Sequence, residues 1–317
     1  MVKRKMLIIS ILFIILIAFF NINITVKIVH ESINIFYNYV LPYILPFLFL
    51  MQIFISLKGG IFLAYYLQKI SFHLLGINGY ETVICLSSIL CGYPSVSIYT
   101  ESLFNQRKIS YKSALDLIHF ASFPSMIFTL GSLAKHLDNP LIPKLIFLSI
   151  LSGGFLILKA RNIDKNYIRK SELTNELKSY KKSDIFSIIK NSINNTLTTT
   201  LFIMFSYIFF SIISNILIQI FPYKIVLILS SFLEFSNGVF SISNLNINNL
   251  IKYNLIILVL CFGGLSILIQ IASFLQSIKL DLKSYFKAKI KHAFTACIIF
   301  NILYILFIIW SFLFPYL

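Results

Sequence analysis

Long apolar segments follow one another along nearly the whole chain, with basic residues between them. A transmembrane helix needs about 20 apolar residues, and a bilayer accommodates apolar surface that a globular core of this length could not bury. Hydrophobic residues make up 58% of the 317 residues and charged residues only 12%. The sequence therefore predicts an all-α polytopic membrane protein, integral and multi-pass, without a separate soluble domain.

The positive charge is concentrated between the apolar segments. The chain has 27 Lys and Arg against 11 Asp and Glu, a formal net charge of +16. In a soluble protein this balance would suggest nucleic acid as a partner. Here it is typical of cytoplasmic loops that follow the positive-inside rule, so we expect the lipid bilayer and no nucleic acid as partner. The strongest such segment, residues 161–184, contains Arg161, Lys165, Arg169, Lys170, Lys178, Lys181 and Lys182.

Several apolar runs predict membrane-spanning helices. No small-residue cleavage site follows the first run, so residues 1–32 are predicted to be an uncleaved N-terminal transmembrane anchor. Pro42 and Pro46 predict a kinked or broken second helix. The more polar segment 61–78 is predicted to lie along the inner interface. The spans are expected at about residues 6–24, 33–57, 113–136, 140–160, 197–222, 250–278 and 293–315, with an amphipathic entry helix at 185–196.

An apolar stretch with a polar interruption, residues 80–106, is predicted to be a re-entrant hairpin. With the basic N-terminus and Lys58 inside, a full crossing there would put Arg107, Lys108 and the 161–184 segment outside, against the charge rule. A hairpin that enters and leaves on the same side removes this conflict.

The second half gives the same prediction. A basic loop expected at 279–292 should lie inside, which allows one full crossing after residue 223, although two apolar stretches occur there. Residues 223–247 have the polar interruption and are taken as the second re-entrant hairpin; the stretch 250–278 stays open as the alternative.

The two halves then share one pattern of a span, a re-entrant hairpin and two further spans. The first repeat covers residues 33–160 and the second 197–317, joined by a cytoplasmic basic linker at 161–196. Because the first hairpin enters from inside and the second from outside, the repeats are inverted. Inverted repeats with broken helices that meet in mid-membrane are typical of secondary transporters.

The hairpin tips supply the first candidate binding residues. Gly92, Tyr93, Pro94 and Ser95 stand at the first tip, and Glu234, Ser236 and Asn237 at the second. A broken helix exposes backbone N–H and C=O groups that bind ions without a charged side chain. A carboxylate in an apolar stretch marks a pathway or coupling site, so Glu234 is a candidate for a coupling proton or Na⁺. An ordinary kink and an interfacial glutamate are the structural alternatives.

Helix breakers also occur in the spans that follow each hairpin. Gly263, Gly264, Ser266 and Gln270 lie in 250–278, and Ser122 precedes Pro124 in 113–136. We include these polar and glycine residues among the substrate-binding candidates. Close helix packing by small residues is the alternative for the two glycines.

We expect no enzymatic activity and no cofactor other than a coupling ion. Asp116, His119 and Ser122 share one helix face, where an attacking geometry is unfavourable. P-loop, HExxH and GxSxG motifs are absent from the sequence. The four cysteines lie inside apolar runs without zinc or haem spacing, so no metal site is expected.

The motifs at these positions resemble the sporulation integral membrane protein family of YlbJ type. That family belongs to the nucleoside recognition or Gate domain superfamily, which is similar to the concentrative nucleoside transporter core. The matching stretches occur in family order: Leu45–Phe47, Cys91–Ser95, Leu233–Gly238 and Phe262–Ser266 with Gln270. The resemblance implies a transporter of a small polar or anionic metabolite during sporulation, with dipicolinic acid as the small-molecule substrate. It also implies a location in the outer forespore membrane of a spore-forming bacterium, with the cell membrane as the alternative.

The chain departs from the family at several positions. Val96–Ile98 follow Ser95 where the family usually has Gly-Ala-Lys, and Leu268–Ile269 stand where a His commonly precedes the final Gln. Few cations are expected in the core to neutralise a dianion, since Lys135 lies near the end of a span. A nucleoside-type or other metabolite carrier of the same fold, and a non-transporting scaffold for spore envelope assembly, therefore stay open. A homo-oligomer is also left open.

Overall fold

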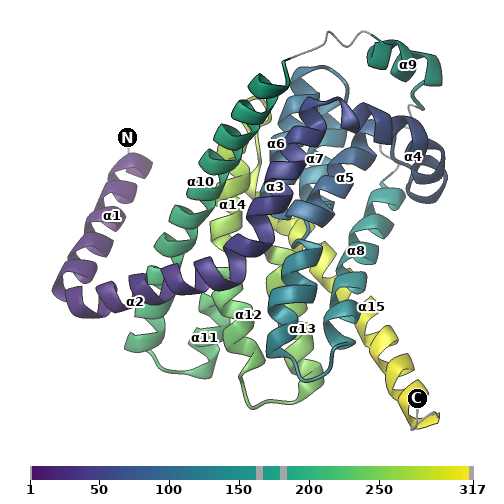
Figure 1. The fold of residues 1–317 in the computed structure, drawn as a ribbon. Helices are drawn as coiled ribbons and strands as arrows, with labels where there is room; N and C mark the ends of the chain where they lie inside the picture. Colours follow the sequence, from purple (N-terminus) through teal and green to yellow (C-terminus); the bar gives the residue numbers. More distant parts are fainter. Residues whose placement is uncertain (1, 162–166, 179–183, 314–317) are drawn as a thin grey trace.

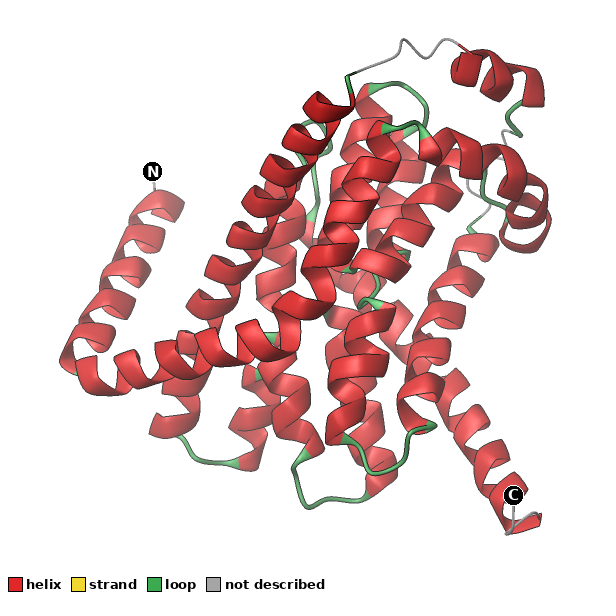
Figure 2. Ribbon diagram, viewed as in Figure 1, coloured by secondary structure: helices red, strands yellow, loops and turns green. Residues whose placement is uncertain are grey.

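The computed structural model describes residues 2–161, 167–178 and 184–313, and these residues form helices and short connections without a β-strand (Figure 2). Among the described residues, five helices are long and apolar enough to cross a membrane, or six if one bent pair is counted as a span. The fold is therefore that of an all-helical, multi-pass membrane protein (Figure 1).

The N-terminal part is helical almost without interruption. Helix α1 (Val2–Phe20) ends at Asn21, and α2 (Ile22–Ile35) continues through a π-helical turn (Phe36–Val40) into α3 (Leu41–Ser56). The chain changes direction between α2 and α3 (Figure 1). The π turn ends two residues before Pro42, which cannot donate a backbone hydrogen bond. The kink predicted from the two prolines is present as this change of direction between α2 and α3. The apolar helix that contains it begins at Ile22, however, and not at residue 33 as predicted.

Helix α4 (Gly59–Leu75) meets α5 (Gly79–Cys91) at an angle of 88°. Gly76 has the left-handed conformation that ends α4. Asn78 then begins α5 with a capping box: its side chain accepts from the Glu81 N–H at 3.1 Å, and Glu81 accepts from the Asn78 N–H at 2.7 Å. The sequence 76–81 therefore specifies a sharp elbow between the amphipathic segment and the first broken helix pair.

Breaks interrupt the helices at the polar positions singled out from the sequence. Gly92 separates α5 from α6 (Tyr93–Asn105), and residues 121–125 follow α7 (Tyr111–Phe120). In the second half, residues 231–234 separate α11 (Lys224–Ser230) from α12 (Phe235–Ser243). Gly263 separates the final broken pair, α13 (Asn249–Phe262) and α14 (Gly264–Phe274). The remaining elements are a π turn (Phe128–Ser132), a 3₁₀ turn (Leu133–His136), α8 (Ile142–Ala160), α9 (Lys170–Lys178), α10 (Ile185–Ile220) and α15 (Leu282–Leu313).

The predicted basic loop at 279–292 is wrong over most of its length, because α15 begins at Leu282. Tyr285, Lys289, His292 and Ala296 are all buried and recur at helical spacing on one face of α15. Packing of this face against the rest of the protein keeps the segment helical, although its many lysines predicted a solvated loop. Helix α10 likewise joins the predicted entry helix and the span after it into one helix.

Three basic segments lie together at one end of the molecule, where Figure 1 shows α9. Lys108 forms an ion pair with Glu176 of α9. The Tyr111 hydroxyl donates to the Lys279 carbonyl at 3.0 Å. Lys165, Lys181 and Lys182 of the predicted linker lie outside the described residues. The clustering is what the positive-inside rule expects of segments that share one side of a membrane.

Candidate functional site at the helix breaks

The first break depends on the backbone of Gly92. Its φ of 87° and ψ of −168° lie in a region open almost only to glycine. A Cβ added at Gly92 would come 3.3 Å from the backbone nitrogen of Ser125. The Ser95 hydroxyl donates to the Gly92 carbonyl at 2.7 Å. The break between α5 and α6 is therefore packed directly against the break that follows α7.

Tyr93 connects the first break to the second half of the chain. Its side chain is buried, and its hydroxyl donates to the carbonyl of Leu260 near the end of α13. Its ring packs edge-on against Phe235, the first residue of α12, with centroids 5.2 Å apart. One side chain thus contacts both broken pairs of the second half.

The second break is held by side chains. Glu234 is 1% exposed and is the N-cap of α12, where its carboxylate accepts from the Asn237 N–H at 2.8 Å. Asn237 accepts from the Tyr207 hydroxyl at 2.6 Å and donates to the Ser211 hydroxyl at 2.9 Å. Asn237 therefore fixes α12 to α10, while the Glu234 carboxylate satisfies the free N-terminal donors of α12.

The second and third breaks satisfy each other's backbone groups. The N–H of Leu265 donates to the Phe232 carbonyl at 2.9 Å, and the N–H of Ser266 donates to the Leu233 carbonyl at 3.0 Å. Gly263 and Gly264 both have positive φ, 73° and 78°, which brings the start of α14 against these carbonyls. Interrupted helices are tolerated in an apolar interior only when the freed groups find such partners.

A small cavity of about 30 Å³ lies between the first and second breaks. This volume holds one or two water molecules. Six of the predicted site residues line it, namely Gly92, Tyr93, Pro94, Glu234, Ser236 and Gln270. Ser125 and Tyr207 also line it and were not predicted. The structure thus brings the two predicted hairpin tips together at one cavity, whose lining is mostly apolar with a few polar side chains.

Four other predicted residues, Ser95, Asn237, Gly263 and Gly264, shape the breaks without lining this cavity. Gln270, which lines the cavity, donates to the Ser206 hydroxyl at 2.8 Å, but its side-chain oxygen is buried without a hydrogen-bond partner among the described residues. The buried Ser266 hydroxyl is likewise unpartnered in the described part of the chain. The Gln270 side-chain oxygen and the Ser266 hydroxyl are therefore the polar atoms near the cavity that are available to accept a hydrogen bond from a ligand.

Ser122 lies in a different cluster, around a buried lysine that sequence reasoning missed. Lys289 is 0% exposed, and its ammonium group donates to the Ser122 carbonyl at 3.2 Å. It also lies 5.4 Å from the ring centroid of Tyr285. Within the described residues no carboxylate is in ion-pair distance of Lys289. The hydroxyls of Ser122 and Tyr285 are buried there without hydrogen-bond partners in the described chain.

Asp116 and His119 show no catalytic arrangement with Ser122. Asp116 pairs with Arg161 at 2.7 Å, whereas the His119 ring packs near Tyr285, with centroids 6.1 Å apart. Among the described residues, no three His, Cys, Asp or Glu side chains form a group that could hold a metal ion.

The chain matches no protein-family model, no curated protein and no solved structure. The class that its fold defines is a multi-pass α-helical membrane protein with interrupted helices around a small cavity.

Proposed function

We propose that this protein is a secondary carrier of a small polar or anionic metabolite. One observation carries the proposal: two helix breaks that are 142 positions apart in sequence, at Gly92 and Glu234, line the same small cavity. Binding residues of secondary transporters are commonly built from such interrupted helices.

The proposed topology has two re-entrant hairpins, α5–α6 and α11–α12, in inverted halves. The contact between Tyr93 and Phe235 supports a meeting of the two tips, with ring centroids 5.2 Å apart. The Tyr111–Lys279 contact supports the idea that both halves return basic loops to one side. Helices α5 and α6 would enter from that side, and α11 and α12 from the other.

The proposed cargo is dipicolinic acid, moved across the outer forespore membrane during sporulation, as the YlbJ-type resemblance implies. Lys289 supports an anionic cargo, since a buried ammonium group without a carboxylate partner is costly unless it serves an anion or a pathway. The segment 122–125 links the two places, because Ser122 binds Lys289 and Ser125 lies against Gly92. A dianion in the cavity would therefore have the Lys289 ammonium group nearby, on the other side of residues 122–125.

The proposed cycle requires the breaks to separate. A cavity of about 30 Å³ cannot hold a dicarboxylate with a ring, so cargo binding would require the cavity to enlarge. Glu234 would bind the coupling proton or Na⁺, because its carboxylate caps α12 at the moving contact. Ion binding at Glu234 would then change the stability of the second break.

Uptake of radiolabelled dipicolinate by proteoliposomes that contain the purified full chain tests the proposal. We expect uptake by the natural protein and by Glu31→Gln, a control at an exposed glutamate of α2. Glu234→Gln should lose at least about tenfold in rate, since it keeps the side-chain shape but not the titratable charge. Uptake that is unaffected by Glu234→Gln would remove Glu234 from the mechanism.

The same assay separates the remaining functions. Uptake of labelled uridine but not dipicolinate would indicate the nucleoside-type carrier, which the altered residues Val96–Ile98 would suit. Correctly folded protein without uptake of either solute would contradict the transport proposal and favour the scaffold function. In that case Glu234→Gln and Asn237→Ala should leave spore formation intact at normal protein levels.

A further inference from the structure

A second pocket lies at the elbow between α4, α5 and α6, at the end of the molecule that carries the basic segments. Its volume is about 150 Å³, against about 30 Å³ for the central cavity. The walls include Ile61, Val83 and the rings of Tyr80 and Tyr99, while Lys58 and Lys108 supply two cations. An apolar pocket with a few convergent polar groups is the usual form of a small-molecule site.

The backbone at the edge of this pocket is strained. Lys58 has a left-handed conformation, with φ of 62°, which is uncommon for a residue other than glycine. Strained backbone concentrates at functional sites, and here it places a lysine at the rim of the pocket.

A segment of the linker is docked beside the pocket. Gln68 of α4 is buried and donates to the Ile168 carbonyl at 2.5 Å, while its side-chain oxygen accepts from the Ile168 N–H at 3.3 Å. The ring of Tyr167 packs edge-on against Phe72, with centroids 5.4 Å apart. Leu173 of α9 is 0% exposed. Residues 167–178 therefore form a specific intramolecular contact with α4.

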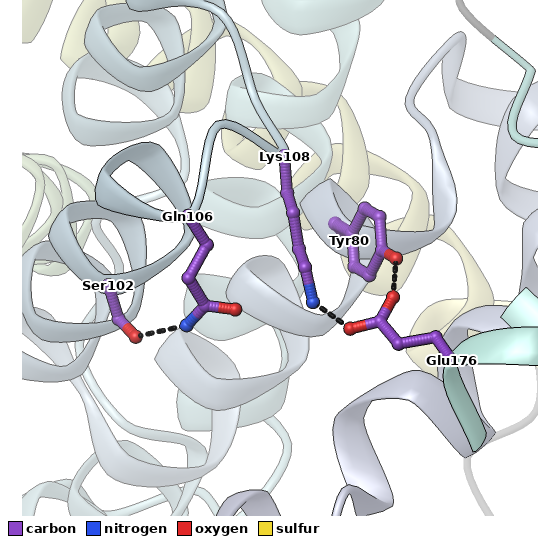
Figure 3. Close-up of polar contacts among 5 residues, drawn as sticks. All are labelled: Tyr80, Ser102, Gln106, Lys108 and Glu176. Atoms are coloured by element: carbon purple, nitrogen blue, oxygen red, sulfur yellow. Dashed lines mark hydrogen bonds and ion pairs between the residues drawn. The ribbon is translucent and has the colours of Figure 1, made fainter. Parts of the chain in front are cut away.

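Helix α9 brings a carboxylate to the cationic edge of the pocket. Figure 3 shows Glu176 reaching from α9 to Lys108 and Tyr80, and its two oxygens accept from the Lys108 ammonium and the Tyr80 hydroxyl. Lys108 also lies 5.0 Å from the ring centroid of Tyr80. Burial opposes ionisation of Glu176, but the hydrogen bonds from Lys108 and Tyr80 outweigh it and hold its pKa below the usual value. This edge of the pocket thus selects an ionised carboxylate.

We propose that the elbow pocket is a binding site for a small organic carboxylate and that Glu176 is its internal competitor. The ligand's carboxylate takes the place of Glu176 between Lys108 and Tyr80, and its apolar body lies against Ile61 and Val83. Lys58 provides a further cationic contact. Ligand binding displaces α9 from the elbow, which couples the pocket to the linker. The inference concerns binding alone and does not depend on the proposed transport function.

Binding of benzoate to the purified full chain in detergent, measured by isothermal titration calorimetry, tests this proposal. Glu176→Gln should bind benzoate about tenfold more tightly than the natural protein, because it weakens the competitor while keeping its shape. Glu172→Gln is the matched control on the same helix, since Glu172 is exposed, and it should bind like the natural protein. The neutral analogue benzamide should show no gain with Glu176→Gln.

Two further variants keep the test independent of folding defects. Adding Lys108→Gln to Glu176→Gln should abolish the gain, and Lys58→Gln in the Glu176→Gln background should weaken binding about threefold or more. Glu234→Gln should leave benzoate binding unchanged, which separates this site from the central cavity.

The proposal is overturned if Glu176→Gln binds benzoate no more tightly than Glu172→Gln, or if the gain survives Lys108→Gln. It is also overturned if glycerol 3-phosphate, a soluble mimic of a lipid headgroup, gains affinity in Glu176→Gln while benzoate does not. In that last case the edge of the pocket would bind phosphate rather than carboxylate.

Discussion

The two helix breaks that line the central cavity are stabilised in different ways. The Gly92 break is a property of the backbone, with φ of 87° and close contact with Ser125. The Glu234 break is held by side chains, since a carboxylate caps α12 and Asn237 joins it to α10. A backbone-determined break has one geometry, whereas a break held by a titratable group changes stability when that group binds an ion. The proposed ion coupling is therefore assigned to the second break, and a rigid wall of the cavity to the first.

The largest expected effect is that of Gly92→Ala. The glycine-only conformation and the close contact with Ser125 should lower the free energy of unfolding by roughly 2–3 kcal/mol. Gly76→Ala is the matched control, because Gly76 also has positive φ, 70°, but no atom lies within 4 Å of its added Cβ. It should cost about 1 kcal/mol. Thermal unfolding followed by a dye that reacts with the buried cysteines compares the two, and equal midpoints would show that the first break is not tightly constrained.

Asn237→Ala should be the most damaging side-chain change at the second break. It removes hydrogen bonds to Tyr207 and Ser211 and leaves the Tyr207 hydroxyl without its acceptor. We expect a loss of about 2 kcal/mol in unfolding free energy. Asn244→Ala, at an exposed position after the same helix, should change stability by less than about 0.5 kcal/mol. Similar unfolding midpoints for both variants would contradict the role of Asn237 in fixing α12.

Replacing Glu234 separates capping from coupling. Glu234→Ala removes the acceptor for the Asn237 N–H and should cost about 1 kcal/mol, the usual value of an N-cap. Glu234→Gln retains a side-chain oxygen and should keep most of that stability, yet lose uptake. If Glu234→Gln has the same unfolding midpoint as Glu234→Ala, the negative charge of Glu234, and not only its side-chain oxygen, stabilises the N-terminus of α12.

The smallest effect on stability is expected for Lys289→Met. A buried ammonium group without a carboxylate partner contributes little net stability, so its replacement should change the unfolding free energy by less than about 1 kcal/mol. Uptake of an anionic cargo should nevertheless fall, whereas Lys287→Met, at an exposed site on the same helix, should leave it intact. A large drop in the unfolding midpoint for Lys289→Met but not for Lys287→Met would instead show that the hydrogen bond from Lys289 to the Ser122 carbonyl stabilises the fold.

Local sequence signals predicted the breaks but not the contacts between them. Gly92, Pro94, Pro124, Gly263 and Gly264 interrupt apolar runs, and the breaks described above occur where such a residue or Glu234 stands. The pairing of Leu265 and Ser266 with carbonyls of the second break depends on folding, since no local pattern specifies which distant backbone groups will meet.

Lys289 shows most clearly why the buried cluster around Ser122 was not predicted. Its neighbours Lys287 and Lys291 are exposed and give the segment the composition of a loop. The informative signal was the spacing of Tyr285, Lys289 and His292 on one helix face, which charge counting hides. The contact that Glu176 of α9 makes with Lys108 and Tyr80 could not be predicted either, because a carboxylate in a basic segment is ordinarily solvated.

Cysteine labelling from each side of the membrane tests the central claim, that the two breaks belong to hairpins entering from opposite faces. In a variant without the native cysteines, single cysteines at the exposed positions Arg107, Asp138 and Asn246 would be labelled with a membrane-impermeant maleimide. The inverted arrangement predicts labelling of position 107 only from the cytoplasm, and of positions 138 and 246 only from the opposite side. Labelling of positions 107 and 138 with the reverse sidedness, or of position 246 from the cytoplasm, would contradict it.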